Sequence, residues 1–456
     1  MESTLNTAFK PVTAIIVGAG HRSIGYADIT FSHPERLKIV GVADPNPIRR
    51  QMALERYGFS EDMCFESAEE LASRGKLADA IINGTLDQLH VKTSLPLLDA
   101  GYDMLLEKPF ALNEEEALTL TECADRNNAK VMICHVLRYA PFYSSIKERI
   151  LNGELGEIIN VQMAEHVSYH HMSIGYVRGK WSNFERSRST MLLAKSCHDM
   201  DLMMWLMSET YPTLVSSFGG RYQYRPENAP PEAGTVCMVD CPLVDTCEYS
   251  SKRLYVDHPE RWGCYVWDAL EHLKNPTHED RVALMKSDSP YARCVYKSDN
   301  NVVDRQSVMV QFASGATGTM NMIGGTPRDR RTISIIGTLG EIHGAFENGV
   351  YTFRRLNPAK EGFSGGYDEE IVDLNRAVVS DGHGGGDDRM VLDFINFVRG
   401  EPTGPACTSI FDSLTGHLCV YKADQSREAN GLPLAVSNTF ERREHHANDI
   451  SLVRRG

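Results

Sequence analysis

Apolar residues in the first third of the chain follow two alternating periodicities. Five short β-branched or aliphatic runs are typical of buried strands: VTAIIVGAG at 12–20, LKIVGVAD at 37–44, ADAIINGT at 78–85, YDMLLEKP at 102–109 and AKVMICH at 129–135. Between them, residues 46–58, 87–101 and 113–128 have helical spacing, and the last segment is acidic in its first turn, as a helix dipole favours. Strands and helices in this order predict a parallel sheet covered by helices on both faces.

The loop after the first run carries candidate chemistry. Gly18 and Gly20 would allow a tight turn and the close approach of a pyrophosphate to amides at a helix N-terminus. The third expected glycine is replaced by Ser23, and two glycines alone could equally form a simple turn. The loop therefore predicts a dinucleotide site only in combination with its surroundings.

Asp44 is the neighbouring residue that strengthens the prediction of a dinucleotide site. It ends the second strand, roughly 20 residues after the glycines, where a carboxylate can accept hydrogen bonds from an adenosine ribose. A carboxylate there repels a 2′-phosphate and favours NAD, although Arg49 and Arg50 leave NADP possible. Alternatively, Asp44 caps the helix that begins near Pro45.

Composition restricts the class of protein. With 456 residues, 42% of them hydrophobic, the chain is long enough for about two or three globular domains. A net charge of -14 disfavours nucleic acid and anionic membranes as partners. The segment MESTLNTAFK does not resemble a secretory signal, no apolar run reaches the ~20 residues of a membrane helix, and 11 scattered cysteines suit a reducing compartment. We expect a cytoplasmic protein that binds a small molecule.

A charged pair follows the fourth strand, in LLEKPF at 105–110. Glu107 and Lys108 lie between the strand and Pro109, which places an ammonium at a strand end, where the nicotinamide of a bound cofactor would lie. In isolation, the pair could equally be part of a surface loop.

The ordered series of motifs resembles that of a known family, the glucose-fructose oxidoreductase / inositol dehydrogenase (Gfo/Idh/MocA) oxidoreductases. The motifs are GAGHR with Asp44, TLDQLH at 85–90, EKP, ICHVLRYAPFY at 133–143, GELGEI at 153–158, CHDMDLMMWL at 197–206, VMVQFASGATGTM at 308–320 and HGGGD at 383–387. The resemblance covers most of the chain, and its main gap is residues 220 to 300.

This resemblance implies an α/β protein with two domains. An N-terminal Rossmann domain with a parallel sheet is expected at 1–134, and a C-terminal α/β domain with a large, mostly antiparallel open sheet at 135–456, with a Cys-containing insertion at about 220–300. In the family this sheet commonly also mediates homodimers or homotetramers. The residues implied to contact NAD(P) are Gly18, Gly20, His21, Arg22, Asp44, Thr85, His90, Glu107 and Lys108.

The segment AKSCHDMD at 194–201 is the expected centre of catalysis. The family's histidine, from a D-x-x-x-H pattern, matches His198, whereas the aspartate position is Ala194 here and Lys195 follows it. On one continuous helix, Lys195 and His198 would share a face, and Lys195 could alternatively pair with Asp199 as solvated charge. We expect His198 to be the general base or acid, Lys108 the electrostatic and relay group, and Lys195 a substrate contact or alternative proton-transfer group.

The substrate class is predicted from the polar and aromatic residues near these motifs. Histidine and aromatic faces with cationic side chains suit a polyhydroxylated ring, so a sugar, glycoside or cyclitol is favoured. Adjacent histidines at 170 and 171 lack the spacing of a zinc helix motif. His135 could also be a buried structural histidine. The expected substrate contacts are His135, Arg138, Tyr139, His166, Trp181, Lys195 and His198.

The insertion carries three thiols within eleven residues, Cys237, Cys241 and Cys247. They could hold a structural zinc ion, with His258 or Cys264 as a fourth ligand. Because the spacing matches no standard zinc motif, unligated cysteines, or one disulfide and a spare thiol, are the alternative.

The favoured function is therefore an NAD(P)-dependent oxidoreductase that acts on a secondary hydroxyl of a carbohydrate. One alternative is a redox-neutral glycosidase that oxidises the sugar transiently on retained NAD, eliminates the aglycone and returns the hydride. Another is a non-catalytic nucleotide or sugar sensor. Retention of Lys108 and His198 argues against the sensor, while the missing aspartate at Ala194 keeps it possible.

Overall fold

The computed structural model describes residues 10–273, 275–361, 365–374 and 384–436. Contacts within the chain divide it into two compact units. Unit 1 comprises Met1–Pro141 and Val379–Ser413, and unit 2 comprises Phe142–Val378 and Leu414–Gly456. The first unit therefore includes a segment that lies far along the chain from the predicted boundary at residue 134.

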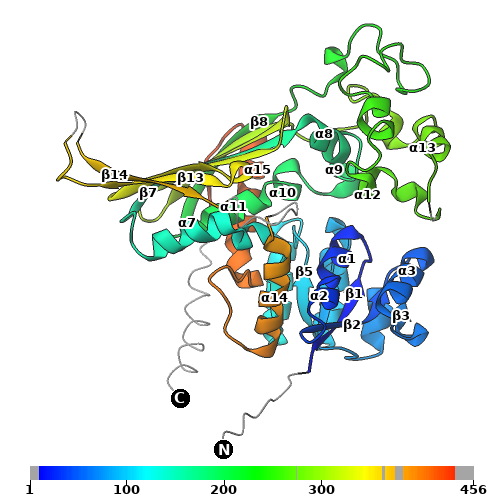
Figure 1. The fold of residues 1–456 in the computed structure, drawn as a ribbon, viewed down its shortest axis with the longest axis horizontal. Helices are drawn as coiled ribbons and strands as arrows, with labels where there is room; N and C mark the ends of the chain where they lie inside the picture. The colour runs from blue at the N-terminus through cyan, green and yellow to red at the C-terminus, as the bar shows by residue number, and fades with distance from the viewer. Residues whose placement is uncertain (1–9, 274, 362–364, 375–383, 437–456) are drawn as a thin grey trace, which may run out of the picture. The chain divides into compact units, whose positions relative to one another are not determined.

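Unit 1 is built on a six-stranded parallel sheet with the order β3-β2-β1-β4-β5-β6 (Figure 1). Its strands are β1 Val12–Val17, β2 Leu37–Ala43, β3 Cys64–Phe65, β4 Ala80–Asn83, β5 Asp103–Leu106 and β6 Val131–Ile133. Their side chains are buried almost throughout, because helices cover a parallel sheet on both faces. The predicted Rossmann sheet is confirmed, and the strand order reverses between β1 and β4, where such folds bind ligands.

Short sequence signals set the helices of unit 1. Asn46 caps α3 (Pro47–Tyr57), Pro47 occupies its first turn and Gly58 ends it in the left-handed region. The other helices are α1 His21–Ala27, α2 Ile29–Ser32, α4 Ala68–Ser73, α5 His90–Asp99, α6 Glu114–Arg126 and α14 Gly386–Arg399. Helix α14 packs against α1 and β1, so a late segment of the chain completes this unit.

Unit 2 is built on a nine-stranded sheet with the order β14-β13-β12-β11-β7-β10-β9-β8-β15. The strands are β7 Ile158–Ser168, β8 Pro212–Gly220, β9 Arg305–Phe312, β10 Thr317–Thr326, β11 Arg330–Gly337, β12 Gly340–Ala345, β13 Val350–Leu356, β14 Tyr367–Asp373 and β15 Leu434–Ala435. Strands β7 and β10 pair in parallel and the other pairs are antiparallel. The predicted large, mostly antiparallel sheet is confirmed.

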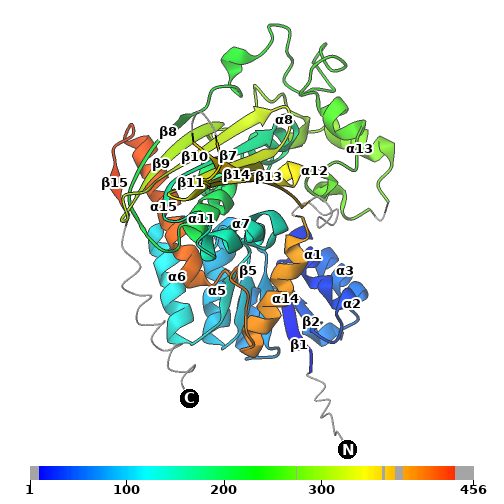
Figure 2. The same cartoon turned by 60° about the vertical axis from the view of Figure 1, so that its left-hand side comes forward.

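Helices cover one face of this sheet (Figure 2). They include α7 Pro141–Leu151, α10 Met191–Ala194, α11 Cys197–Leu206 and α15 Ile410–Glu428. Exposed and buried residues alternate along β9 without interruption, because successive side chains point to opposite faces. The second face is open, and Phe218, Met309 and Ile323 project from it with 64, 58 and 40% exposure.

The predicted insertion is the excursion between β8 and β9, which are neighbouring antiparallel strands. It contains α12 Gly263–Val266 and α13 His278–Met285 and has its own hydrophobic core, with Tyr255 and Tyr291 among the buried residues. Buried Arg178, which precedes the insertion, donates to the Tyr255 hydroxyl and to the carbonyl oxygens of Tyr249 and Arg293. These bonds attach the insertion to the segment that follows β7.

Candidate functional site

The glycine loop of unit 1 connects β1 to α1. Gly18 has a φ of +76°, and a Cβ atom there would lie 2.9 Å from atoms of Thr85. Gly20 is the N-cap of α1, no side chain caps this helix, and a Cβ atom on Gly20 would meet nothing within 4 Å. Exposed His21 begins the helix. The loop leaves open space in front of uncapped amides, which fits the pyrophosphate of a dinucleotide.

Asp44 is buried after β2, and its carboxylate organises the glycine loop. One oxygen accepts a hydrogen bond from the amide of Ala19 at 2.7 Å, and the other accepts one from the amide of Asn46 at 2.8 Å. The cap of α3 is Asn46, so the alternative role of Asp44 as that cap is wrong. Each carboxylate oxygen has a further lone pair for a ribose hydroxyl. Arg50 donates to the carbonyl oxygen of Asp44 at 2.7 Å.

Glu107 anchors the loop after β5. Its carboxylate accepts hydrogen bonds from the Tyr26 hydroxyl at 2.6 Å, from Nε of Arg22 at 3.2 Å and from the amide of Lys108 at 2.9 Å. Arg22 also pairs with Asp387 at 2.7 Å. Burial opposes ionisation of Glu107, but the charges of Arg22 and Lys108 outweigh it and hold the pKa of Glu107 below its ordinary value. Arg22 and Glu107 thus brace the loop that carries half-buried Lys108.

Buried His90 joins the loops that follow β4 and β5. Its Nδ1 lies 2.7 Å from the carbonyl oxygen of Pro109, and its Nε2 lies 3.0 Å from the carbonyl oxygen of Thr85. The Thr85 hydroxyl donates to the side chain of Asn83 at 2.9 Å. Since β4 and β5 are adjacent parallel strands, these bonds fix the strand-end loops that border Gly18.

The predicted substrate residues of unit 1 are buried. His135 is 1% exposed, and burial, followed by the charges of Arg138 and Lys108, lowers the pKa of its imidazole well below the ordinary value. Its ring is therefore neutral at pH 7. The Tyr139 hydroxyl donates to Asp393 of α14 at 2.9 Å, which favours a structural role for Tyr139.

In unit 2, the ammonium of Lys195 is bound to Glu165, a carboxylate that is not among the predicted site residues. Its Nζ lies 2.9 Å from Oε1 of Glu165, while Nε of Arg331 lies 2.7 Å from Oε2. The side chain of Glu165 is fully buried, and Arg331 is directly opposite it on the neighbouring strand β11. Two cations therefore share one buried carboxylate.

Arg331 also binds Asp199, the residue after His198. Its Nε lies 3.0 Å from Oδ1 of Asp199, which is 1% exposed. Burial raises the pKa of Asp199 to about 6; Arg331 opposes this rise and Glu165 adds to it. A carboxyl group with a pKa in this range can hold or release a proton near neutral pH.

His198 lies in the first turn of α11 and is 8% exposed. Lys195 is not on this helix, because α10 ends at Ala194 and α11 begins at Cys197. The continuous helix assumed for Lys195 and His198 is therefore wrong, as is a Lys195 to Asp199 ion pair: Lys195 pairs with Glu165. The buried position of Ala194 leaves no carboxylate where the family pattern has aspartate.

His166 and Glu165 show how strand register separates neighbours. Val161, Met163, Glu165 and Val167 are buried at alternate positions of β7, so His166 points to the open face of the sheet, away from the Lys195 contact. This arrangement disfavours the predicted role of His166 as a substrate contact next to Lys195. A carboxylate in a period-two apolar series was the sequence signal that could have identified Glu165.

Five rings form a closed arrangement in unit 2. The ring of His171 lies 4.4 Å from that of Trp262 and 6.0 Å from that of Tyr176. Trp181, a predicted substrate residue, lies 5.7 Å from Tyr176, and Tyr265 lies 6.1 Å from Trp181 and 5.8 Å from Trp262. Trp262 and Tyr265 come from the insertion, so this excursion contributes to the same aromatic group as Trp181.

His171 links the aromatic group to the charged cluster. It lies in α8 (Tyr169–Met172), and its Nδ1 is 3.2 Å from Oδ1 of Asp329. Burial and then the charge of Lys195 lower the pKa of His171 to about 4, despite the opposing effect of Asp329. A neutral imidazole therefore stands between the aromatic faces and Lys195.

The three predicted thiols lie around one small cavity of about 20 Å³, together with Cys294. His258 lines a different pocket and Cys264 is exposed, so neither is the expected fourth partner. Within the described residues, no group of three or more His, Cys, Asp or Glu side chains is placed to hold a metal ion. The zinc prediction is not supported, and the described cysteines are free thiols.

Family models match both units. Residues 12–135 match the oxidoreductase family with an NAD-binding Rossmann fold, and residues 147–259 match the C-terminal alpha/beta domain of the same oxidoreductase family. The matches together cover more than half of the chain. This chain belongs to the Gfo/Idh/MocA family. It is an NAD-binding oxidoreductase of that family, as its motifs predicted.

Curated relatives of this Gfo/Idh/MocA protein are distant. The oxidoreductase YteT of Bacillus subtilis is 25% identical over 316 residues, which is 67% of this chain and 69% of YteT. Inositol 2-dehydrogenase of Corynebacterium glutamicum is 23% identical over 43% of this chain, and the match spans 54% of that enzyme.

Solved structures share the fold at low identity. Levoglucosan dehydrogenase, in complex with NADH and levoglucosan, superposes with a TM-score of 0.66 at 15% identity and covers 94% of this chain and all of its own. The WlbA dehydrogenase of Bordetella pertussis, in complex with NADH and UDP-GlcNAcA, has a TM-score of 0.65 at 16% identity and covers 94% and 99% of the two chains. In the part of the chain that the structure describes, no helix combines the length and apolarity that a membrane crossing requires.

Proposed function

We propose that this protein transfers a hydride between NAD and a secondary hydroxyl of a sugar, glycoside or cyclitol. The observation that carries the proposal is a buried cluster that includes Asp199, the residue after His198: Glu165 holds Lys195, and Arg331 holds Asp199. An alcohol oxidation needs a proton acceptor and a cation near the developing alkoxide. The cluster offers both in a protein whose other unit is an NAD-binding fold.

The cofactor role belongs to unit 1. When bound, NAD supplies the hydride acceptor. The open space at Gly20 accommodates the pyrophosphate, and the carboxylate of Asp44 favours NAD over NADP because a 2′-phosphate would meet negative charge. Arg50 is occupied by the carbonyl oxygen of Asp44, which further weakens the case for NADP.

The cofactor site can be tested without turnover. A Gly20→Ala variant should weaken NADH binding by about tenfold or more while its melting temperature stays within a few degrees, because the added methyl group meets only the space reserved for the cofactor. Gly25→Ala is the matched control in α1, where a Cβ atom also meets nothing within 4 Å. NADH fluorescence titration would contradict the proposal if both variants bound equally well.

Four residues are assigned to the chemistry. We assign His198 to accept the hydroxyl proton and Lys108 to stabilise the developing alkoxide and relay charge. Lys195 binds the substrate hydroxyl, with Glu165 fixing its ammonium at 2.9 Å. Asp199 is the neighbouring carboxyl that can take up a proton near neutral pH.

Relatives support the substrate class by their names. Inositol 2-dehydrogenase and glucose-6-phosphate 3-dehydrogenase both specify one hydroxyl of a polyhydroxylated ring. The aromatic group formed with Trp181 and Trp262 supplies faces that suit stacking on such a ring.

The test is a screen of the purified protein with NAD against glycosides, free sugars and inositols, in which NADH absorbance and sugar products are followed together. We expect NADH and an oxidised sugar in equal amounts. His198→Asn and Lys108→Ala should reduce kcat/KM by about 10²- to 10⁴-fold, while the exposed-lysine control Lys286→Ala keeps wild-type rates.

Two results would overturn the proposal. Glycoside cleavage without net NADH would indicate the redox-neutral glycosidase. Ligand binding without turnover, unchanged in Lys108→Ala, would indicate a sensor.

We also propose that the open face of the unit 2 sheet joins copies of the chain into a homodimer or homotetramer. Phe218, Met309 and Ile323 are exposed on that face, and exposed apolar side chains on one sheet face favour an interface. Light scattering should show an oligomer that Met309→Glu dissociates; a monomeric wild type would contradict this assembly.

A further inference from the structure

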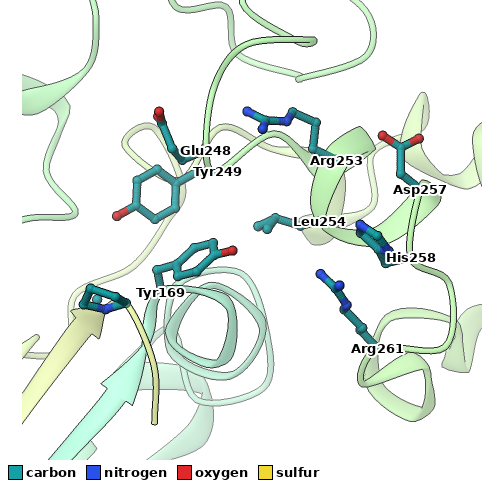
Figure 3. A pocket seen from close by; sticks show the side chains of 10 residues that line it. Tyr169, Glu248, Tyr249, Arg253, Leu254, Asp257, His258 and Arg261 are labelled. Carbon is teal, nitrogen blue, oxygen red and sulfur yellow. The ribbon is translucent and has the colours of Figure 1, made fainter.

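One cavity of unit 2 is lined by none of the residues assigned to the chemistry. It has a volume of about 620 Å³ and is lined by Tyr169 of α8, by insertion residues between Glu248 and Arg261, by Gly325 near the end of β10 and by Pro327, which follows that strand (Figure 3). The insertion therefore encloses space of the size that a monosaccharide unit or a larger ligand occupies.

Arg261 brings an uncompensated cation to this pocket. Within the described residues, its guanidinium makes no hydrogen bond or ion pair, whereas Arg253 at the same pocket donates to the carbonyl oxygens of Thr246 and Cys247 at 2.8 and 3.1 Å. Figure 3 shows the Arg261 guanidinium and the Tyr169 hydroxyl directed toward a common central space. Both groups are donors that a ligand could satisfy.

The pKa of His170 reflects the positive charge of Arg261 at this pocket. Burial is the main cause that lowers the pKa of His170, and the charges of Arg261 and His258 lower it further. His170 follows Tyr169, so the charge of Arg261 acts at the start of α8. An anion bound beside Arg261 would compensate this charge.

The chemistry of the lining indicates which anion fits. One available guanidinium presents a planar pair of donors that matches a carboxylate. Asp257 and Glu248 also line the pocket, and their charges disfavour a dianionic phosphate more than a monoanionic carboxylate. Tyr169 and Tyr249, with ring centroids 6.1 Å apart, add aromatic faces for a sugar ring.

The pocket adjoins the charged cluster through two short segments. Tyr169 lines the pocket, while His171, two residues later in α8, binds Asp329 and lies close enough to Lys195 for its charge to lower the pKa of His171. Arg261 lines the pocket, while the next residue, Trp262, packs on His171 at 4.4 Å.

The backbone conformation of Trp262 allows Arg261 to line the pocket while Trp262 packs on His171. Its φ is +53°, in the left-handed region that a bulky side chain rarely adopts. The unusual backbone turns consecutive side chains, Arg261 and Trp262, toward the pocket and the His171 ring respectively.

We propose that this pocket is a subsite for a uronate unit, a sugar that carries a carboxylate, with Arg261 as its main contact. The inference rests on the proposed carbohydrate function and narrows it to acidic glycosides: one unit binds at Arg261 and an adjoining unit is presented to Lys195 and His198.

The test is calorimetric titration of the full-length protein with D-glucuronate, D-glucose and D-glucose 6-phosphate. Glucuronate should bind, and Arg261→Gln should weaken it by about tenfold or more, as loss of a charge-assisted carboxylate contact predicts. Arg186→Gln, which removes an exposed ion pair to Asp299 elsewhere in unit 2, is the control and should bind like wild type.

Each other outcome overturns the subsite. Equal binding of glucose would exclude recognition of the carboxylate, and tighter binding of glucose 6-phosphate would indicate a phosphate site. Unchanged affinity in Arg261→Gln would place the ligand elsewhere. Because titration needs no turnover, NADH formation from neutral sugars without glucuronate binding would reject the subsite alone. Binding lost in Arg261→Gln, with no NADH from any sugar or acidic glycoside, would reject the oxidoreductase proposal instead.

Discussion

An arginine held between two carboxylates occurs in each unit, and the two clusters differ in their exposure to water. In unit 1, Arg22 pairs with Glu107 and Asp387, and the side chains retain 30, 11 and 20% exposure. A hydroxyl and a backbone amide also donate to Glu107, so its negative charge is well satisfied and its pKa is lowered.

In unit 2, Arg331 lies between Glu165 and Asp199, whose side chains are 0 and 1% exposed. Here desolvation dominates for Asp199, and the pKa of this carboxyl rises instead. An arginine with two carboxylates thus has a different role in each unit. The more exposed cluster of unit 1 keeps a fixed charge that holds a loop. The buried cluster of unit 2 contains a carboxyl group that can change its protonation state.

The largest expected effect tests the burial of the unit 2 cluster. Glu165→Gln removes the charge shared by Lys195 and Arg331 and leaves buried cations without compensation, so the free energy of unfolding should fall by about 3–5 kcal/mol. Glu341→Gln, which breaks the exposed pair with Arg354 on the same sheet, should cost about 0–1 kcal/mol. Urea denaturation measures both, and similar losses would refute the distinction between the clusters.

A smaller effect tests the protonation of Asp199. Its pKa is raised from 3.8 to about 6 in the folded protein, so its contribution to stability is present below pH 4 and is lost as pH rises through 6. The stability of wild type relative to Asp199→Asn should therefore fall by about 1–3 kcal/mol between pH 4 and 7.

Urea denaturation at a series of pH values gives this difference. The groups that face Asp199 are Arg331, Glu165, Lys195 and Tyr143, and all of them remain in the variant. A difference that does not change with pH would show that Asp199 is ionised throughout the range.

The contrast between the clusters also explains what the sequence could predict. The strands and helices of unit 1 follow from local periodicity, and Asp44 meets the glycine loop across only 25 positions, so sequence patterns were sufficient. Glu165, Lys195 and Arg331 meet only through the pairing of β7 with β11 and the break between α10 and α11. No local spacing encodes that meeting, so the sequence could suggest Lys195 and mark Glu165 as a buried carboxylate, but it could not show that the two pair.

The insertion illustrates the same limit. Its position followed from the gap in the family resemblance, but its contribution to the site did not. Trp262 reaches His171 from more than 90 positions away, and Cys294, rather than His258 or Cys264, joins the other three thiols. Such partners are set by packing of the insertion core, which has no periodic signature in the sequence.

The smallest expected effect tests the cluster of unit 1, whose side chains are 11 to 30% exposed. Glu107→Gln keeps a hydrogen-bonding group beside Tyr26 and leaves Arg22 its second carboxylate, so the loss at pH 7 should be about 1 kcal/mol. Because the folded pKa of Glu107 is below its ordinary 4.5, its contribution is present above that pH and is lost as pH falls through the folded pKa. The stability difference between wild type and this variant should shrink on acidification, opposite in sign to that for Asp199→Asn. If both differences moved in the same direction, the two clusters would share one electrostatic regime, and the assignment of Asp199 as the titrating member of the site would lose its basis.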